Sequence, residues 1–311
     1  MESTSSITFE EIQQQALQLG WDDVGITSAA IPQEDVEAYH EWLRLNYQGD
    51  LAYMENQIRC DPQQLLPNAK TAILFITYYK QTTQPFLEDA GLIASYARGK
   101  DYHHLHRKRL KKFIQWLEKR TGQTHIAKGF SDSTPILEKA LAVQAGLGWF
   151  GKNTLLIHRK FGTFTLLAGL LTTLDIEHPL PFPRLPKCGS CTRCLDACPT
   201  QALVAPYQLN ATKCLSYHLI ESKQEIPETI QQKNPGYVFG CDICQDVCPH
   251  NQRKAESELS EFKPDQGNGA YLNLEKLEVL NTQPELLFGT PLQRRGVKGL
   301  EYSLKTLKKK S

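Results

Sequence analysis

Residues 188–199 read CGSCTRCLDACP, and the interpretation of the whole chain starts from this stretch. Its spacing, Cys-x2-Cys-x2-Cys-x3-Cys-Pro, is that of bacterial ferredoxins, where three cysteines bind one [4Fe–4S] cluster and the fourth reaches a second cluster. Residues 241–249 read CDICQDVCP and repeat the end of the pattern, but Val238 stands where its first cysteine would be. The single Cys214 upstream is able to supply the missing thiolate through a loop. The two stretches therefore predict two complete [4Fe–4S] sites.

In two-cluster ferredoxins the last cysteine of each run binds the cluster of the other run. The same arrangement here divides the eight predicted ligands into two sets. The first set is Cys188, Cys191, Cys194 and Cys248, and the second is Cys198, Cys214, Cys241 and Cys244. Disulfides are disfavoured because closely spaced CxxC pairs in a reducing compartment favour metal or redox chemistry. Zinc needs neither the third cysteine at the same interval nor the repeated Cys-Pro ending. The ninth cysteine, Cys60, is predicted to be a small buried hydrophobic residue.

Composition limits the class of protein. The chain has 311 residues, 41% of them hydrophobic, which is enough for two domains and a sizeable core. Its net charge of +1 gives no global sign of nucleic-acid binding, although residues 107–112 and 294–310 are rich in lysine and arginine. Residues 1–10 are polar and acidic, without a signal peptide or a twin-arginine pair, and no apolar stretch has the length of a membrane span. We expect a soluble, cytoplasmic protein.

Hydrophobic periodicity predicts a mixed architecture. Helices are expected at residues 9–19, 34–45, 107–120 and 136–145, and strands at 23–26, 71–79, 93–96, 125–129 and 164–174. Strands alternating with helices indicate an α/β (α+β) N-terminal domain over residues 1–178. Prolines between 179 and 186 predict a linker into a ferredoxin-like double-cluster domain over residues 179–253. A short, basic, helical C-terminal tail is expected over residues 254–311.

The stretch 146–153, GLGWFGKN, matches two nucleotide-binding patterns in part. As GxGxxG it has the wrong context, because it follows a predicted helix and not a strand. As GxxxxGK it ends in Asn153, where a serine or threonine is needed to bind magnesium. We therefore expect a helix C-cap at Gly146 followed by a tight glycine turn, which leaves the backbone open to a close ligand.

Asp132 stands between two serines, just before Pro135 and a predicted helix. One interpretation is an N-cap carboxylate. The other is a proton donor whose pKa is raised by a closed apolar pocket. Residues 102–106, YHHLH, present a second polar cluster, and we expect surface or ligand-contact residues there in preference to a metal site.

Several motifs, in this order and at these intervals, resemble the epoxyqueuosine reductase family over roughly residues 8 to 300. They are Arg59-x-Asp61-Pro62, LLPNAK at 65–70, YARGKDYH at 96–103, Asp132, AGLGWFGKN at 145–153 and the double cysteine pattern. The resemblance implies reduction of the epoxide of epoxyqueuosine, at the wobble position of tRNA, to the alkene of queuosine. It also implies cobalamin held against two [4Fe–4S] clusters in a cobalamin-binding N-terminal domain.

The resemblance further implies roles for individual residues. Asp132 matches the family's proton donor, and the eight cysteines match the cluster ligands. The residues in segments that line the cobalamin site are Arg59, Tyr96, Asp132, Lys152, Asn153, Ser216 and Asp242. No DxHxxG signature is present, so we expect no protein histidine to replace the cofactor's own base.

The implied partners are the anticodon stem-loop of tRNA and an external electron donor of the flavodoxin or ferredoxin type, and we expect a monomer. Larger relatives extend into a helical tail that helps hold tRNA, and residues 288–295 look like its beginning. Three other functions stay open at this point, of which a pure tRNA-binding protein is the least favoured because its redox clusters would be idle. A reductive dehalogenase would share cobalamin and clusters, but is normally exported through a twin-arginine signal. A ferredoxin-type electron-transfer protein would explain the cysteines alone.

Overall fold

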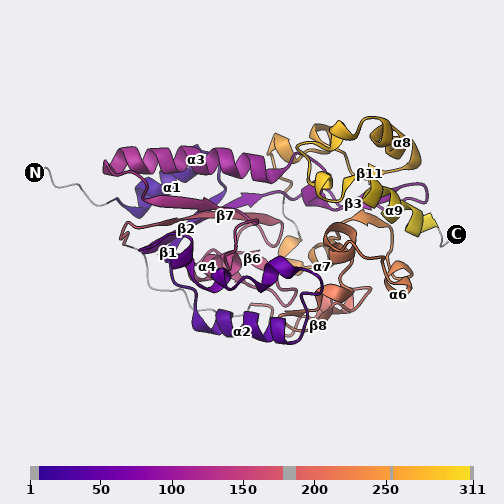
Figure 1. The fold of residues 1–311 in the computed structure, drawn as a ribbon, viewed down its shortest axis with the longest axis horizontal. Helices are drawn as coiled ribbons and strands as arrows, with labels where there is room; N and C mark the ends of the chain where they lie inside the picture. Colours follow the sequence, from indigo (N-terminus) through magenta and orange to yellow (C-terminus); the bar gives the residue numbers. More distant parts are fainter. Residues whose placement is uncertain (1–6, 178–186, 253–254, 309–311) are drawn as a thin grey trace, which may run out of the picture.

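A four-stranded antiparallel sheet organises the N-terminal part of the molecule (Figure 1). The computed structural model describes residues 7–177, 187–252 and 255–308. The strands lie in the order β1-β2-β7-β4, with β1 at Asp23–Ser28, β2 at Thr71–Tyr78, β7 at Thr165–Thr172 and β4 at Ala127–Phe130. The alternation of strands and helices along the chain had predicted a sheet, but it did not fix the strand direction.

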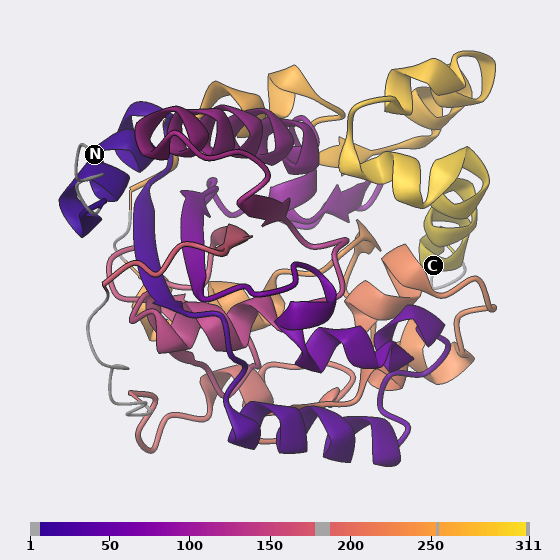
Figure 2. The ribbon, with the colours of Figure 1, turned by 60° about the vertical axis from the view of Figure 1, so that its left-hand side comes forward.

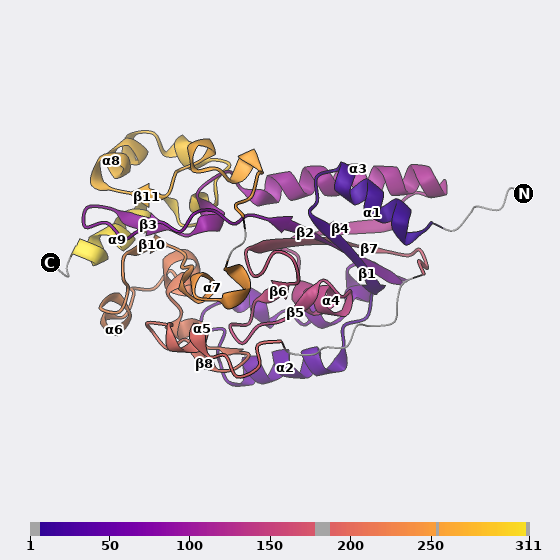
Figure 3. The same ribbon diagram turned by 180° about the vertical axis from the view of Figure 1, so that it is seen from behind.

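Strand β2 is buried on both faces because its side chains alternate between two cores. Ile73 and Phe75 pack towards α1 (Phe9–Gln18) and α3 (Tyr102–Thr121), which cover one face of the sheet. The alternate residues of β2 pack on the other face, where α4 (Glu138–Gln144) covers the sheet. Figure 3 shows these layers edge-on, with α1 and α3 on one side of the strands and α4 on the other. The predicted mixed α and β composition is confirmed, and the arrangement is helix–sheet–helix.

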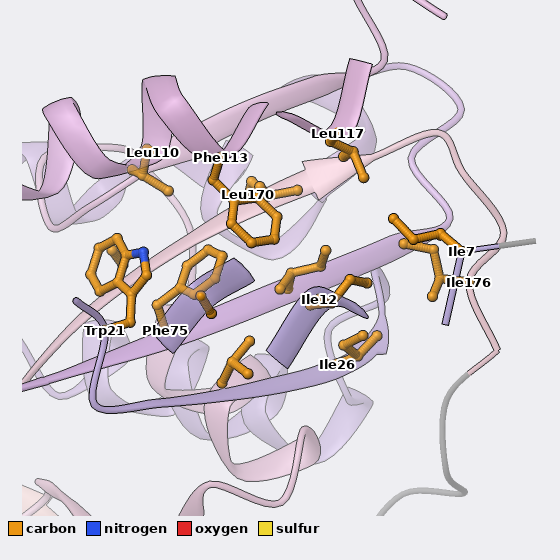
Figure 4. Packing of buried hydrophobic residues seen from close by; sticks show 14 of the residues in the cluster. Ile7, Ile12, Trp21, Ile26, Phe75, Leu110, Phe113, Leu117, Leu170 and Ile176 are labelled. Atoms are coloured by element: carbon orange, nitrogen blue, oxygen red, sulfur yellow. The ribbon is translucent and has the colours of Figure 1, made fainter. Parts of the chain in front are cut away.

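Aromatic rings fill the core between the sheet and α3 (Figure 4). The indole of Trp21 stacks on Phe75 with ring centroids 4.8 Å apart, and Phe75 meets Phe113 edge-on at 4.9 Å. Aromatic pairs in such offset and edge-to-face geometries stabilise a core beyond the area they bury. Arg109 points inward from the basic face of α3 and lies over the Trp21 ring at 5.3 Å, so this core also fixes the rotation of α3.

A second, three-stranded sheet joins parts of the chain that are far apart in sequence. Strand β3 (Gly91–Ile93) pairs in parallel with β10 (Tyr237–Phe239) and antiparallel with β11 (Tyr271–Leu272). The predicted 1–178, 179–253 and 254–311 segments each contribute one strand to it. Helices α8 (Leu274–Thr282) and α9 (Gly296–Lys308) pack beside this sheet, at the opposite end of the molecule from α1 (Figures 1 and 2).

The remaining elements are short, apart from one helix. They are α2 (Gln33–Arg44), β5 (Gly148–Phe150), β6 (Leu156–His158), α5 (Arg193–Asp196), β8 (Leu203–Ala205), β9 (Gln208–Leu209), α6 (Glu228–Gln231) and α7 (Ile243–Asp246). Helices α5 and α7 contain Cys194 and Cys244, one cysteine from each run, and contact one another. The proline stretch predicted as a linker lies outside the described residues. Among those described, no helix is both long and apolar enough to cross a membrane.

The sequence placed two element boundaries wrongly. Helix α3 begins at Tyr102 and not at residue 107, because the Asp101 side chain accepts the backbone N–H of His103 and caps the helix there. The strand expected at 93–96 ends at Ile93 and continues as a 3-10 turn, Ser95–Ala97. Cys60 is partly exposed, so its assignment to the core was also wrong. Its Sγ lies 3.9 Å from His40 Nε2.

Candidate active site

A cavity of about 610 Å³ opens between α2, α4 and the β5–β6 hairpin. Aromatic and aliphatic side chains dominate its wall, which is typical of sites for small molecules and cofactors of this size. The charged groups on the wall include Arg59, Asp132, Glu138 and Lys139. Within the described part of the chain, no histidine lines the cavity.

Asp132 reaches this cavity from a strained turn that follows β4. Its φ of 53° lies in the left-handed region, which aspartate tolerates better than most residues. The backbone N–H of Ser133 donates to the carbonyl oxygen of Ser131 at 2.6 Å, closing a three-residue turn around Asp132. A turn of this type with positive φ is uncommon and strained, and such strain persists where the surroundings enforce it.

The N-cap interpretation of Asp132 is wrong. Helix α4 begins at Glu138, its N-cap position is Leu137, and no side chain caps it. The Glu138 side chain instead reaches back, and its Oε2 accepts the backbone N–H of Asp132 at 3.2 Å. Glu138 therefore holds the strained turn against the start of the helix, a role that the sequence analysis did not identify.

The side chain of His103 lies between two carboxylates. Its Nδ1 is 2.7 Å from Asp101 Oδ1, and its Nε2 is 3.2 Å from Asp132 Oδ2. Burial lowers the pKa of His103, but the hydrogen bonds to the two carboxylates outweigh it and raise the pKa to about 9. The hydrogen bond from His103 lowers the pKa of Asp132, which overcomes the opposing effect of burial. The expectation of a raised pKa at Asp132 was wrong, because a histidine that lies 29 residues away in sequence holds the carboxyl in its charged form.

Glu138, beside Asp132, is a carboxyl whose pKa rises. Burial raises the pKa of Glu138 to about 7, and the nearby charge of Asp132 adds to the effect. The site thus holds two carboxyls whose surroundings move their pKa values apart, an arrangement typical of acid–base chemistry. His106, from the predicted polar cluster, is buried between Ser131 Oγ and Thr77 Oγ1 and takes no part in the cavity wall.

The first predicted set of cysteines surrounds a separate cavity of about 120 Å³. Its wall includes Cys188, Cys191, Cys194 and Cys248 together with Lys152, Asn153 and His250. Lys152 Nζ donates to the carbonyl oxygens of Gly189 and Cys191, at 2.7 and 2.9 Å, and so fixes the first cysteine loop. Four thiols around one small cavity suit a [4Fe–4S] cluster.

The second set lies around Cys244, which is part of α7. Burial raises the pKa of the Cys244 thiol, and the neighbouring thiols of the same set raise it further. That set is Cys198, Cys214, Cys241 and Cys244. In the described residues no three candidate ligands lie close enough to hold a single metal ion. Each cysteine of a [4Fe–4S] cluster binds a different iron, so wider spacing of the thiols is what such a cluster requires.

The β5–β6 hairpin separates the large cavity from both cysteine sets. Trp149 lines the large cavity and packs against Cys248, while Asn153 Nδ2 donates to the carbonyl oxygen of Cys244 at 3.4 Å. A Cβ at Gly151 would lie 2.5 Å from Asn153 Oδ1 and 2.8 Å from Ile157 Cδ1, so a larger residue there would displace both side chains. The C-cap of α4 is Ala145, and Gly146 follows it with a φ of 77°, so the predicted helix end is confirmed while the glycine stands one residue beyond the cap.

The residues that the family resemblance implied as cofactor contacts do not all line one cavity. Arg59 and Asp132 line the large cavity, and Lys152 and Asn153 line the cysteine cavity beside it. Tyr96, Ser216 and Asp242 line neither. Asp242 is buried, and its Oδ2 accepts the backbone N–H and the hydroxyl of Ser95 at 2.6 and 2.8 Å.

Comparison with known proteins identifies both the cysteine-rich segment and the segment that contains Asp132. A family model described as "4Fe-4S double cluster binding domain" matches residues 187–251, and one described as "Epoxyqueuosine reductase QueG, DUF1730" matches residues 59–133. The first match confirms the prediction of a domain for two [4Fe–4S] clusters. The second spans the segment from Arg59 to Asp132 and Ser133, which supplies most of the polar groups described above.

Curated relatives extend the likeness to nearly the whole chain. The epoxyqueuosine reductase of Leadbetterella byssophila is 36% identical over 96% of this chain and 98% of its own length. That of Cyclobacterium marinum is 40% identical over 81% of this chain and 82% of its own. A solved epoxyqueuosine reductase with an epoxyqueuosine-modified tRNA-Tyr stem loop is 30% identical, with a TM-score of 0.81, over 96% of this chain and 80% of that one. The chain belongs to the epoxyqueuosine reductase family.

Proposed function

We propose that this epoxyqueuosine reductase protonates the epoxide oxygen of its substrate at the Asp132 turn, on the wall of the large cavity. The reaction of the family converts the epoxide of epoxyqueuosine in tRNA to the alkene of queuosine. The observation that carries the proposal is the carboxyl of Asp132, which faces the cavity from a strained turn and is hydrogen-bonded to His103. A solved relative from Bacillus subtilis, 28% identical with a TM-score of 0.83, is described with an aspartate catalytic loop swung out of its active site.

The large cavity suits cobalamin. Its wall is largely apolar, and Arg59 and Lys139 add positive charge to it. Trp149 is part of the cavity wall, and its buried Nε1–H has no acceptor in the described residues, as expected of a group that a bound molecule would satisfy. Cobalamin supplies the strong nucleophile or radical partner that cleavage of a C–O bond requires. The protein groups around it orient the substrate, exclude water and hold the protons.

The two cysteine sets provide the path for electrons. In this proposal Cys188, Cys191, Cys194 and Cys248 hold one cluster, and Cys198, Cys214, Cys241 and Cys244 hold the other. A cluster held by the first set would lie next to the large cavity, because Trp149 of the β5–β6 hairpin lines that cavity and packs against Cys248. Electrons come from an external donor of the flavodoxin or ferredoxin type.

Recognition of the tRNA backbone is assigned to the exposed face of α3. Arg107, Lys108, Lys111 and Lys112 are all exposed there, while Arg109 points into the core. Lysine and arginine contacts to phosphates give affinity and salt dependence but no choice of sequence. In the C-terminal segment, by contrast, Arg294 pairs with Glu221 and Arg295 donates to the Ser222 carbonyl oxygen, so these two cations are already bound within the chain.

Turnover under anaerobic conditions tests the function. Reconstituted protein, cobalamin and a chemical reductant are mixed with an anticodon stem-loop that carries epoxyqueuosine, and the nucleoside is analysed by mass spectrometry. Loss of one oxygen atom from the modified base is the expected result. No product from protein with verified clusters and bound cobalamin would contradict the proposed function.

A further inference from the structure

While Asp101 and Asp132 are both ionised, the geometry of His103 calls for protons on both of its ring nitrogens. Nδ1 faces Asp101 Oδ1 at 2.7 Å and Nε2 faces Asp132 Oδ2 at 3.2 Å, and an ionised carboxylate offers only acceptors. A neutral imidazole carries one N–H, so it would leave one of the two contacts without a hydrogen atom. The imidazolium ion satisfies both.

The reaction needs more protons than Asp132 alone is able to hold. Conversion of an epoxide to an alkene consumes two electrons and two protons, and the oxygen leaves as one molecule of water. Both protons end on the same oxygen atom, and the external donor of the proposed function supplies the two electrons. Asp132 rests as a carboxylate, so it must take up a proton before it is able to deliver the first one. It must then be protonated again before it delivers the second.

We propose that His103 is the residue that reloads Asp132, passing the proton on Nε2 to Asp132 Oδ2 each time the carboxyl has donated to the substrate oxygen. This inference rests on the proposed function. His103 is a positioning and proton-transfer residue, since it reaches the substrate through Asp132. After each transfer the neutral imidazole takes a new proton from solvent.

The surroundings of His103 suit this role. Asp101 caps α3 through the backbone N–H of His103 and binds Nδ1 of the same residue, so one carboxylate fixes both the backbone and the ring. The ring of Tyr102 stacks on the imidazole with centroids 4.1 Å apart. The His103 side chain is 26% exposed, which leaves water a route to the ring.

The groups around His103 explain why it holds its proton at neutral pH. From α3 and its cap it faces Asp101, Tyr102 and His106, and from the β4–α4 turn it faces Asp132, with Glu138 behind that carboxyl. Tyr96 and Arg294 face Asp132 from two other elements. The two nearest charges are both carboxylates, and they raise the pKa of His103 to about 9. The proton is therefore present below that pH and is lost above it.

Histidine titration tests the inference without turnover. The holoprotein is labelled with ¹³C in its histidine rings, its clusters are kept oxidised, and the His103 signal is the one that disappears in His103→Gln. We expect a midpoint near pH 9 in the wild type and a lower one in Asp101→Asn, where asparagine keeps the helix cap but removes one carboxylate. A wild-type midpoint near the ordinary histidine value of about 6.5 would overturn the inference.

Single-turnover rates measured against pH provide the second test. The wild-type rate should stay level up to about pH 8 and fall as His103 loses its proton. In His103→Gln the pKa of Asp132 returns towards about 3.9, so the rate should fall about tenfold for each pH unit across the neutral range. His104→Gln, an exposed neighbour on the same helix, should keep the wild-type profile. An unchanged profile in His103→Gln would refute the inference, whereas an inactive wild type would count against the proposed function instead.

Discussion

Replacement of Asp132 by asparagine separates chemistry from structure at this site. Asparagine has nearly the same shape, and it tolerates a φ of 53° as well as aspartate does. The hydrogen bond that closes the turn joins backbone atoms of Ser131 and Ser133, and Glu138 accepts from the backbone N–H of residue 132. The substitution therefore removes the carboxyl that exchanges protons and leaves its supports in place.

The size of the effect follows from where Asp132 lies. Its side chain is 57% exposed, so loss of its ion pair with His103 should lower the free energy of unfolding by less than about 1 kcal/mol. Loss of general acid catalysis typically lowers a rate by about 10²- to 10⁴-fold, which corresponds to roughly 2.7–5.4 kcal/mol in the activation free energy. The kinetic effect should thus greatly exceed the effect on stability.

The assay is single turnover of the modified stem-loop by fully reconstituted protein, with iron and cobalamin contents measured on the same samples. Asp175→Asn is a matched control, because Asp175 is an aspartate on the surface, 79% exposed, with only Lys70 as its ionic partner among the described residues. A rate for Asp132→Asn within about tenfold of the wild type, at equal cofactor content, would remove Asp132 from proton transfer.

Three further predictions concern the clusters, the pH dependence of stability and the second sheet. Cys214→Ala should lower the iron content from two clusters to about one per chain, while Cys60→Ala should leave it unchanged; equal iron in both variants would mean that Cys214 is not a ligand. Glu138 has a folded-state pKa of about 7 against an ordinary value of 4.5, so the stability it contributes is present below pH 4.5 and is lost as the pH rises to about 7. Glu138→Gln should remove this decline in melting temperature, and an unchanged slope would show that Glu138 is not its source. In Gly91→Ala the new Cβ would lie 1.9 Å from Val238 Cγ1, so denaturant unfolding should show a loss of about 1–3 kcal/mol, whereas Gly129→Ala, whose nearest neighbour is the flexible Leu110 side chain at 3.3 Å, should lose less.

Local patterns carried much of the prediction. The cysteine spacing alone led to a domain for two [4Fe–4S] clusters, because ligands close together in sequence must lie close together in space. The apolar run of β2 indicated a strand buried on both faces, and Gly146 indicated the end of α4. These signals are short-range, so one stretch of sequence contains all the information that they need.

The active site depended on contacts that no single stretch contains. Asp132 looked like an N-cap because it precedes a helix, but the helix begins six residues later and its Glu138 turns back to the Asp132 backbone. Its pKa was expected to rise in an apolar pocket, yet His103, from another helix, lowers it. The charge of a carboxyl depends on its nearest neighbours in space, and here those neighbours come from three separate segments.

The sequence by itself determined the family, the cluster chemistry and the main helices and strands, because each of these is encoded in residues at fixed, short intervals. Only the tertiary structure decided that the sheet is antiparallel, that all three predicted segments share a second sheet, and that Asp101, His103, Asp132 and Glu138 form one group of titratable side chains. Strand direction and proton affinity both arise from the packing of distant segments. They are therefore fixed only when the chain has folded.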